Sequence, residues 1–232
     1  MTDEMVDANV TYKFKFGPGK ERVYEIKIKP DDLSLIEPSF ASLPEWTDLE
    51  HCKCSHCPLK KEQSPKCPIA KNLAYIADEY QGHKSFEVVE VEVYTRYRNY
   101  FKKISLQEGL YSIFGLIMAT SSCPHMKFLR PMARFHLPFS NFQETIVRSS
   151  SFYLLGQFFV QKNGGKPDFH LKGLDLLYEK VQQVNLGIIE RIRSVATGDA
   201  DANSVTILQG FAQLLSMQLS DDLSEIEPYF TS

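Results

Sequence analysis

Residues 51–70 read HCKCSHCPLKKEQSPKCPIA, and this stretch holds four of the five cysteines of the chain. These are Cys52, Cys54, Cys57 and Cys67, while the fifth, Cys123, lies far along the sequence. A cluster of thiols with one distant partner is typical of a closed metal site that joins two parts of one fold. We therefore expect the chain to be organised around such a site.

The spacing of the cysteines indicates which four would share a metal. Cys54 and Cys57 are separated by two residues, which lets the backbone wrap one metal, and Cys67 follows after nine more. Cys123 completes a set of four sulfurs, and Cys52 is left over because its spacing to Cys54 is tighter than most one-metal chelates use. The competing nitrogen ligands are His51, His56 and His125. The alternatives to a metal site are reduced thiols in a loop or a redox disulfide pair.

The sequence favours zinc as the metal, because closed tetrahedral thiolate sites are most often zinc sites. A [4Fe–4S] cluster is the alternative, since Cys57, Cys67 and Cys123 are each followed by proline, as in some iron–sulfur ligation patterns. The spacing is not that of a ferredoxin. The lysines that would offset the charge of four thiolates are Lys53, Lys60, Lys61 and Lys66.

Composition and charge limit the classes of function. The chain has 232 residues, of which 43% are hydrophobic and 12% aromatic, as in a globular protein with a sizeable core. A net charge of −3 gives no general reason to expect nucleic acid or a membrane, so we expect another protein as partner. The N-terminus lacks an apolar signal segment, and the most apolar run, Leu110 to Ala119, is far shorter than the ~20 residues that span a bilayer. We expect a cytoplasmic protein, in which grouped cysteines more often bind metal than form disulfides.

The first part of the chain predicts a small antiparallel sheet. Apolar and polar residues alternate over residues 9–29 on both sides of a turn at Gly17–Lys20, which is the pattern of a β-hairpin. Residues 86–94 alternate Glu with Val and provide the third strand that a hairpin needs for stability. Trp46 is expected to pack the cysteine loop onto the body of the protein.

The rest of the chain predicts helices, because apolar residues recur there with a period near 3.6. Capping-box patterns at Ser105–Glu108 and Ser140–Gln143 open two of them, and a polar turn at 197–203 separates the last two. The predicted helices cover residues 69–80, 105–120, 140–163, 171–195 and 204–219. The expected fold class is α+β, with a β-rich part at 1–104 and a mostly helical bundle at 105–232. We expect one continuous globular unit, joined by the metal site.

A second group of chemically active side chains follows Cys123, in a part of the chain that is basic and rich in proline. The candidates for a catalytic or anion-binding role are Arg130, Arg134 and His136. His136 would be a proton carrier or a partner of a metal ligand, and Arg130 an anion clamp. The simpler interpretation is a buried histidine with a backbone partner, and arginines paired to Glu144 or to a C-terminal acid. Glu144 and Arg148 have the spacing of an ion pair on a helix surface.

Three segments, in this order, resemble a bacterial family of uncharacterised proteins. They are Trp46–Leu49, then Cys54–Leu59 together with Cys67–Ala70, then Cys123–Phe139 with its closing His-Leu-Pro-Phe. The resemblance extends to Glu144, Thr145, Arg148 and Tyr153–Leu155, so it covers most of the chain. It implies the same four cysteines as the shared set, leaves Cys52 outside it and carries no function over.

These patterns are compatible with three functions. The favoured one is a non-enzymatic accessory or regulatory protein with a structural zinc site, which predicts a colourless zinc protein that unfolds on chelation. The second is an iron–sulfur protein in redox chemistry or sensing, which predicts a brown protein that bleaches in air. The third is an anion-binding or phosphoryl-handling enzyme that uses Arg130, Arg134 and His136. The sequence contains no evident nucleophile–base–acid set and no glycine-rich phosphate loop.

Overall fold

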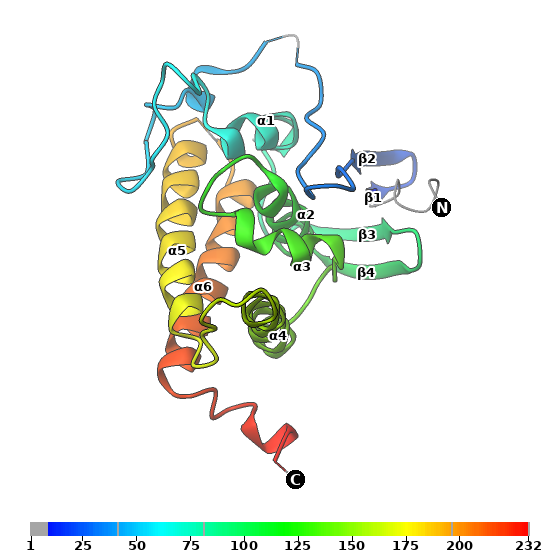
Figure 1. Ribbon diagram of the computed structural model, residues 1–232. Coiled ribbons are helices and arrows are strands. Elements are labelled where there is room, and N and C mark those ends of the chain that lie inside the picture. Colours follow the sequence, from blue (N-terminus) through cyan, green and yellow to red (C-terminus); the bar gives the residue numbers. More distant parts are fainter. Residues whose placement is uncertain (1–8, 41, 81, 196, 232) are drawn as a thin grey trace.

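The computed structural model describes residues 9–40, 42–80, 82–195 and 197–231, and over these residues the fold is α+β. Figure 1 shows the sheet on one side, two long helices side by side on the other, and further helices between them. The expectation that the chain begins without a signal segment concerns residues 1–8, which lie outside the described residues. Among the described helices, none is long and apolar enough to cross a membrane.

The sheet is antiparallel, with strand order β2-β1-β3-β4. Its strands are β1 (Val10–Gly17), β2 (Lys20–Ile26), β3 (Val88–Tyr94) and β4 (Asn99–Ser105). The predicted hairpin and third strand are confirmed, since β1 pairs with β2 on one side and with β3 on the other. Gly17 and Gly19 have φ values of +137° and +73°, which glycine adopts without strain in a tight turn.

The alternation in the sequence separates a buried face of the sheet from a wet one. Val89, Val91 and Val93 of β3 are buried, together with Tyr12 and Phe14 of β1. The intervening glutamates and lysines lie on the other face, where opposite charges form ion pairs across the strands. One face of the sheet is therefore available to bury helices.

The strand β4 is not predicted by the sequence pattern. Within it only Ile104 is buried, and Phe101 is 63% exposed, so no alternation of buried and exposed side chains marks the strand. It lies at the edge of the sheet and pairs with β3 from Val88–Ser105 to Tyr94–Asn99. Backbone hydrogen bonds to β3 hold β4 in place. Because these bonds do not depend on side-chain type, the amino-acid composition of β4 does not predict a strand.

All five predicted helices are present, with a short one added in the proline-rich segment. They are α1 (Pro68–Tyr80), α2 (Leu106–Thr120), α3 (Arg130–Arg134), α4 (Phe142–Lys162), α5 (Lys172–Arg193) and α6 (Ala200–Ser220). Three 3₁₀ turns are η1 (Glu45–Thr47), η2 (Lys127–Leu129) and η3 (Glu227–Tyr229).

The predicted caps are partly right. The capping box of α2 is confirmed, because the Glu108 carboxylate accepts a hydrogen bond of 3.0 Å from the Ser105 backbone N–H. The box of α4 lies one residue later than predicted: Asn141 Oδ1 accepts from the Glu144 N–H at 2.9 Å, and the Glu144 carboxylate accepts from the Asn141 N–H at 2.8 Å. The negative charge of Glu144 also interacts favourably with the dipole of α4. Gln143, which would close the predicted box, is neutral and lacks this interaction.

The last helix begins earlier than predicted, at Ala200 rather than Ser204. The Asp199 carboxylate accepts hydrogen bonds from the Ser85 backbone N–H at 2.7 Å and the Ser85 hydroxyl at 3.0 Å. The polar residues that suggested a turn therefore form the first turn of α6, fixed to the segment before β3.

The core is continuous from the sheet into the helices. Tyr80 of α1 packs against Phe14 with 6.0 Å between ring centroids, and α2 crosses the same face of the sheet. Gly109 makes this crossing possible, because a Cβ there would lie 2.7 Å from Phe14 and 3.0 Å from Val91. On its other side α2 packs against α6, which in turn pairs with α5 (Figure 1).

Replacing Gly109 by alanine should lower the free energy of unfolding by about 1–3 kcal/mol, because the added methyl group overlaps Phe14 and Val91. The matched control is Gly210→Ala in α6, where nothing lies within 4 Å of the added Cβ. The control should be stabilised by about 0.5–1 kcal/mol through helix propensity. Urea denaturation measures both, and a stabilised Gly109→Ala variant would contradict the close packing of α2 on the sheet.

Candidate metal centre

The cysteine loop is closed at its base by pairing between the residues before and after it. Asp48 and Lys66 form an isolated antiparallel bridge, and their side chains form an ion pair at 2.5 Å. The Cys67 N–H donates to the Thr47 carbonyl at 2.7 Å. This closure brings Cys67, at the start of α1, to the same end of the loop as the earlier cysteines.

Arg191 of α5 anchors this base to the helical bundle. Its side chain is buried, and Nη1 donates to the carbonyls of Trp46 at 2.9 Å and Asp48 at 2.7 Å. Its Nη2 donates to the Leu49 carbonyl at 2.8 Å. One buried cation thus fixes three backbone carbonyls within four residues. The expected packing of Trp46 against the body is confirmed by its 3% exposure.

The chain turns tightly between the two closely spaced cysteines and presses one of them against α5. The Cys57 N–H donates to the Cys54 carbonyl at 3.0 Å and closes a turn, and both cysteines line the same cavity. A Cβ on Gly187 would lie 2.7 Å from Cys54 Sγ. A side chain at this point of α5 would therefore displace the thiol from its position.

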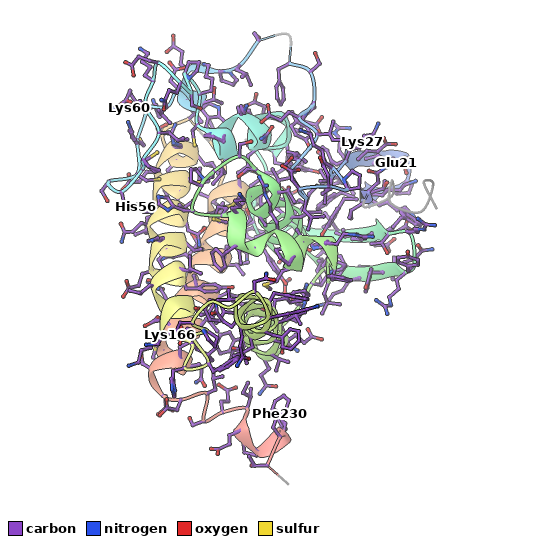
Figure 2. The ribbon with its side chains drawn as sticks, viewed as in Figure 1. Glu21, Lys27, His56, Lys60, Lys166 and Phe230 are labelled. Atoms are coloured by element: carbon purple, nitrogen blue, oxygen red, sulfur yellow. The ribbon has the colours of Figure 1, made fainter. Side chains whose placement is uncertain are left out.

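The distant cysteine is brought to the loop by the segment between α2 and η2. Ser121 caps the end of α2, and its hydroxyl accepts a hydrogen bond of 3.3 Å from the Cys123 N–H. His125 Nε2 is hydrogen-bonded to the His56 carbonyl at 3.0 Å, and the two rings stack with 4.2 Å between centroids. Figure 2 labels His56 beside α5 and Lys60 farther along the same loop. The His56–His125 contact joins the loop to the segment that carries Cys123.

The four cysteines of the predicted set line one small cavity of about 20 Å³ between the loop, the start of α1, the segment after α2, and α5. They are Cys54, Cys57, Cys67 and Cys123. Side chains of Lys53, His125 and Arg191 line the same cavity, together with apolar residues of α5. Among the described residues, however, no group of three or more Cys, His, Asp or Glu side chains is close enough together to hold a metal ion.

The other predicted alternatives lie elsewhere. Cys52 does not line the cavity and adopts a positive φ of 44°. His51 Nε2 is hydrogen-bonded to the Ser194 hydroxyl at 2.9 Å. The His56 ring stacks on the His125 ring and does not line the cavity. Of the three histidines considered as ligands, only His125 lines the cavity.

The cavity disfavours ionised thiols. Burial, followed by the neighbouring Cys67 and Cys57, raises the pKa of Cys54 to about 11, although Arg191 opposes the shift. Burial likewise raises the pKa of Cys123 to about 12, with the other three thiols adding to the shift. Four thiolates in this place would need further positive charge beyond Lys53 and Arg191, and a bound metal supplies it.

The second predicted group does not form a common site. The Arg130 guanidinium donates to the carbonyls of Asp32 at 3.0 Å and Ser121 at 3.2 Å, and it pairs with the Asp32 carboxylate at 3.5 Å. Arg134 lies over the Phe135 ring, 5.9 Å from its centroid. The expected partners of Arg130, Glu144 or a C-terminal acid, are therefore wrong, because its two terminal nitrogens contact Asp32 and Ser121 instead.

His136 is hydrogen-bonded to a side chain rather than to the backbone partner we expected. Its Nε2 lies 2.5 Å from the Tyr12 hydroxyl, which is 2.7 Å from the Ser112 hydroxyl. Burial and the nearby charge of Arg148 lower the pKa of His136 to about 3, so the ring is neutral near pH 7. The predicted Glu144–Arg148 pair is also replaced, since the Arg148 guanidinium donates to the carbonyls of Met132 and Phe135 at 3.1 and 2.9 Å.

The fold and this site define the class: an α+β protein in which thiols from two distant segments line one cavity against a helical bundle. The chain belongs to the family described as Domain of unknown function (DUF6901), whose family model matches residues 10–231. No curated protein matches the chain, and no solved structure does. This family is consistent with the resemblance to an uncharacterised family, while the bacterial source and the cysteine motif of the family stay predictions.

No sequence motif points to Arg191 and Gly187, which shape the site from α5. Arg191 lies on the same buried face as Val184 and Ile188, so a charged residue interrupts an apolar stripe there. A cation at such a position indicates a buried hydrogen-bonding role. Gly187 had no comparable pattern, because its neighbour, Cys54, lies far away in the sequence.

Replacing Arg191 by methionine should lower the free energy of unfolding by about 3 kcal/mol, because three buried carbonyls lose a charged donor. Arg193→Met is the matched control, since Arg193 is exposed in the last turn of the same helix. The control should change stability by less than about 0.5 kcal/mol. Urea denaturation of the two variants provides the comparison, and equal stability would show that Arg191 does not hold the loop.

Proposed function

We propose that this protein carries one thiolate-bound metal centre, held by Cys54, Cys57, Cys67 and Cys123. The observation that supports the proposal is the shared cavity: three cysteines of the loop and one from beyond α2 line the same enclosed space. Burial and the neighbouring thiols raise the pKa of Cys54 and Cys123, so these two ligands would ionise near pH 7 with the help of a cation bound beside them. Metal binding would turn this arrangement into a source of folding free energy.

We propose zinc as the occupant, as the sequence pattern favours. The four thiols surround a space of about 20 Å³, which has room for one water-sized body and not for a cluster of irons and sulfides. In a tetrahedral zinc site each sulfur lies ~2.3 Å from the metal. Among the described residues no three ligands are gathered that closely, so the loop would close further around the ion. A [4Fe–4S] cluster is the competing occupant and requires the four thiols to move apart.

The role that fits this centre is a binding or sensing one. The centre would tie the loop at 48–67 to the segment after α2, so its occupancy would decide whether the loop is fixed to the bundle. Fixing or releasing this loop would change the surface that the protein offers to a partner. Such a protein would act as an accessory or regulatory protein or as a redox sensor. We further propose a reducing compartment such as the cytoplasm, because thiolate centres persist there. The net charge of −3 supports another protein as the partner.

Replacing any one of the four cysteines by alanine should remove most of the metal, because each leaves the centre one ligand short. Cys52→Ala is the matched control, since Cys52 belongs to the same loop but does not line the cavity. Iron, sulfide and zinc are measured per chain in anaerobically purified protein, together with the visible absorbance. We expect about one zinc per chain and no visible absorbance in the unaltered chain and in Cys52→Ala.

Two other outcomes are informative. About four irons and four sulfides per chain, lost in all four variants but kept in the control, would retain the four-thiol centre and replace zinc by a [4Fe–4S] cluster. A chain without iron or zinc, or an equal loss in Cys52→Ala, would contradict the proposal.

A further inference from the structure

A second and larger cavity, of about 150 Å³, lies within the helical part of the protein. Residues of α2, α3, α4, α5 and α6 line it, and Figure 1 shows α2, α3 and α4 beside the pair of long helices α5 and α6. The lining is mainly apolar and includes Leu116, Met126, Met132, Val181, Leu208 and Phe211. An engineered cavity of about this volume binds benzene, so the space suits a molecule with a ring-sized body.

Asn185 of α5 presents an unpaired amide to this cavity. The residue is 1% exposed, lines the cavity, and neither its Nδ2 nor its Oδ1 has a hydrogen-bond partner among the described residues. A buried amide without partners is unfavourable, whereas nearly all buried polar groups in proteins are paired. The amide offers one donor group and one acceptor to whatever occupies the space.

Arg148 of α4 adds a cation to the wall of the same cavity. One of its terminal nitrogens holds the end of α3 through the carbonyls of Met132 and Phe135. Among the described residues no carboxylate lies within ion-pair distance of it, and burial lowers its pKa. The neighbouring His136 is neutral near pH 7, so it adds no second positive charge to this wall. A partly buried guanidinium that lacks a protein carboxylate is a ready partner for an anionic group.

We propose that this cavity is a binding site for a small carboxylate with an apolar, ring-sized body and a second polar group. The carboxylate pairs with Arg148, the body fills the apolar space, and the polar group is hydrogen-bonded to Asn185. The site uses neither Arg130 nor Arg134, and it is independent of the proposed metal centre. Few polar groups at defined points of an apolar pocket are the usual form of a small-molecule site.

The test uses 4-hydroxybenzoate and benzoate as probes in calorimetric titrations of the full chain. We expect 4-hydroxybenzoate to bind one to one, and Arg148→Met to weaken the binding of both probes at least tenfold. Asn185→Leu should weaken 4-hydroxybenzoate more than benzoate, because only the former carries the second polar group. The control is Arg134→Met, whose side chain does not line the cavity and which should leave both affinities unchanged.

Saturating binding that these variants alter as stated supports the proposal. Absence of binding by either probe at millimolar concentration, or binding that Arg148→Met and Asn185→Leu leave unchanged, overturns it and leaves a cavity filled by water alone. If Arg148→Met does not fold, nuclear Overhauser effects from the ring protons of 4-hydroxybenzoate to the methyl groups of Leu116 and Met126 decide the question in the unaltered protein. Their presence supports the site, and their absence overturns it.

Discussion

The buried guanidinium of Arg191 is the interaction on which the cysteine loop depends. A cation removed from water is costly unless hydrogen bonds replace its hydration, and here the carbonyls of Trp46, Asp48 and Leu49 do so. The loop gains a fixed base, and the cavity gains a positive charge on its wall. That charge opposes the rise in the pKa of Cys54. Arg191 therefore both anchors the loop and favours the ionised form of one of its thiols.

The loop has little else to hold it. Trp46, Leu49 and Cys67 are buried at its base, while most residues between Glu50 and Lys66 are exposed or half-buried. The His56–His125 contact and the close approach of Cys54 to Gly187 bring three segments together without a sizeable apolar core. A metal centre joining Cys123 to the loop would supply the missing stabilisation, as structural metals do where hydrophobic burial is small.

The sequence predicts much of this fold, because the spacing of apolar residues indicates which face of a strand or helix is buried. The alternation of Val89, Val91 and Val93, and the 3.6-residue period of the helices, each reflect one buried face. It does not predict β4, whose side chains are mostly exposed and whose structure comes from a neighbouring strand. It places the cap of α4 one residue early, because Ser140 and Asn141 are both good caps and the choice rests on Glu144. The four thiols are predicted as a set from spacing alone, but Arg191, Gly187 and Asn185 are not, since their roles depend on residues distant in sequence.

The most direct measurement is alkylation of the five cysteines in the purified protein under anaerobic conditions, read residue by residue by mass spectrometry. Shared metal ligation predicts that iodoacetamide modifies Cys52 alone, and that Cys54, Cys57, Cys67 and Cys123 become reactive together when the metal is removed. If Cys123 instead reacts at the same rate before and after metal removal, independently of the other three, the thiols of the two segments do not share a centre.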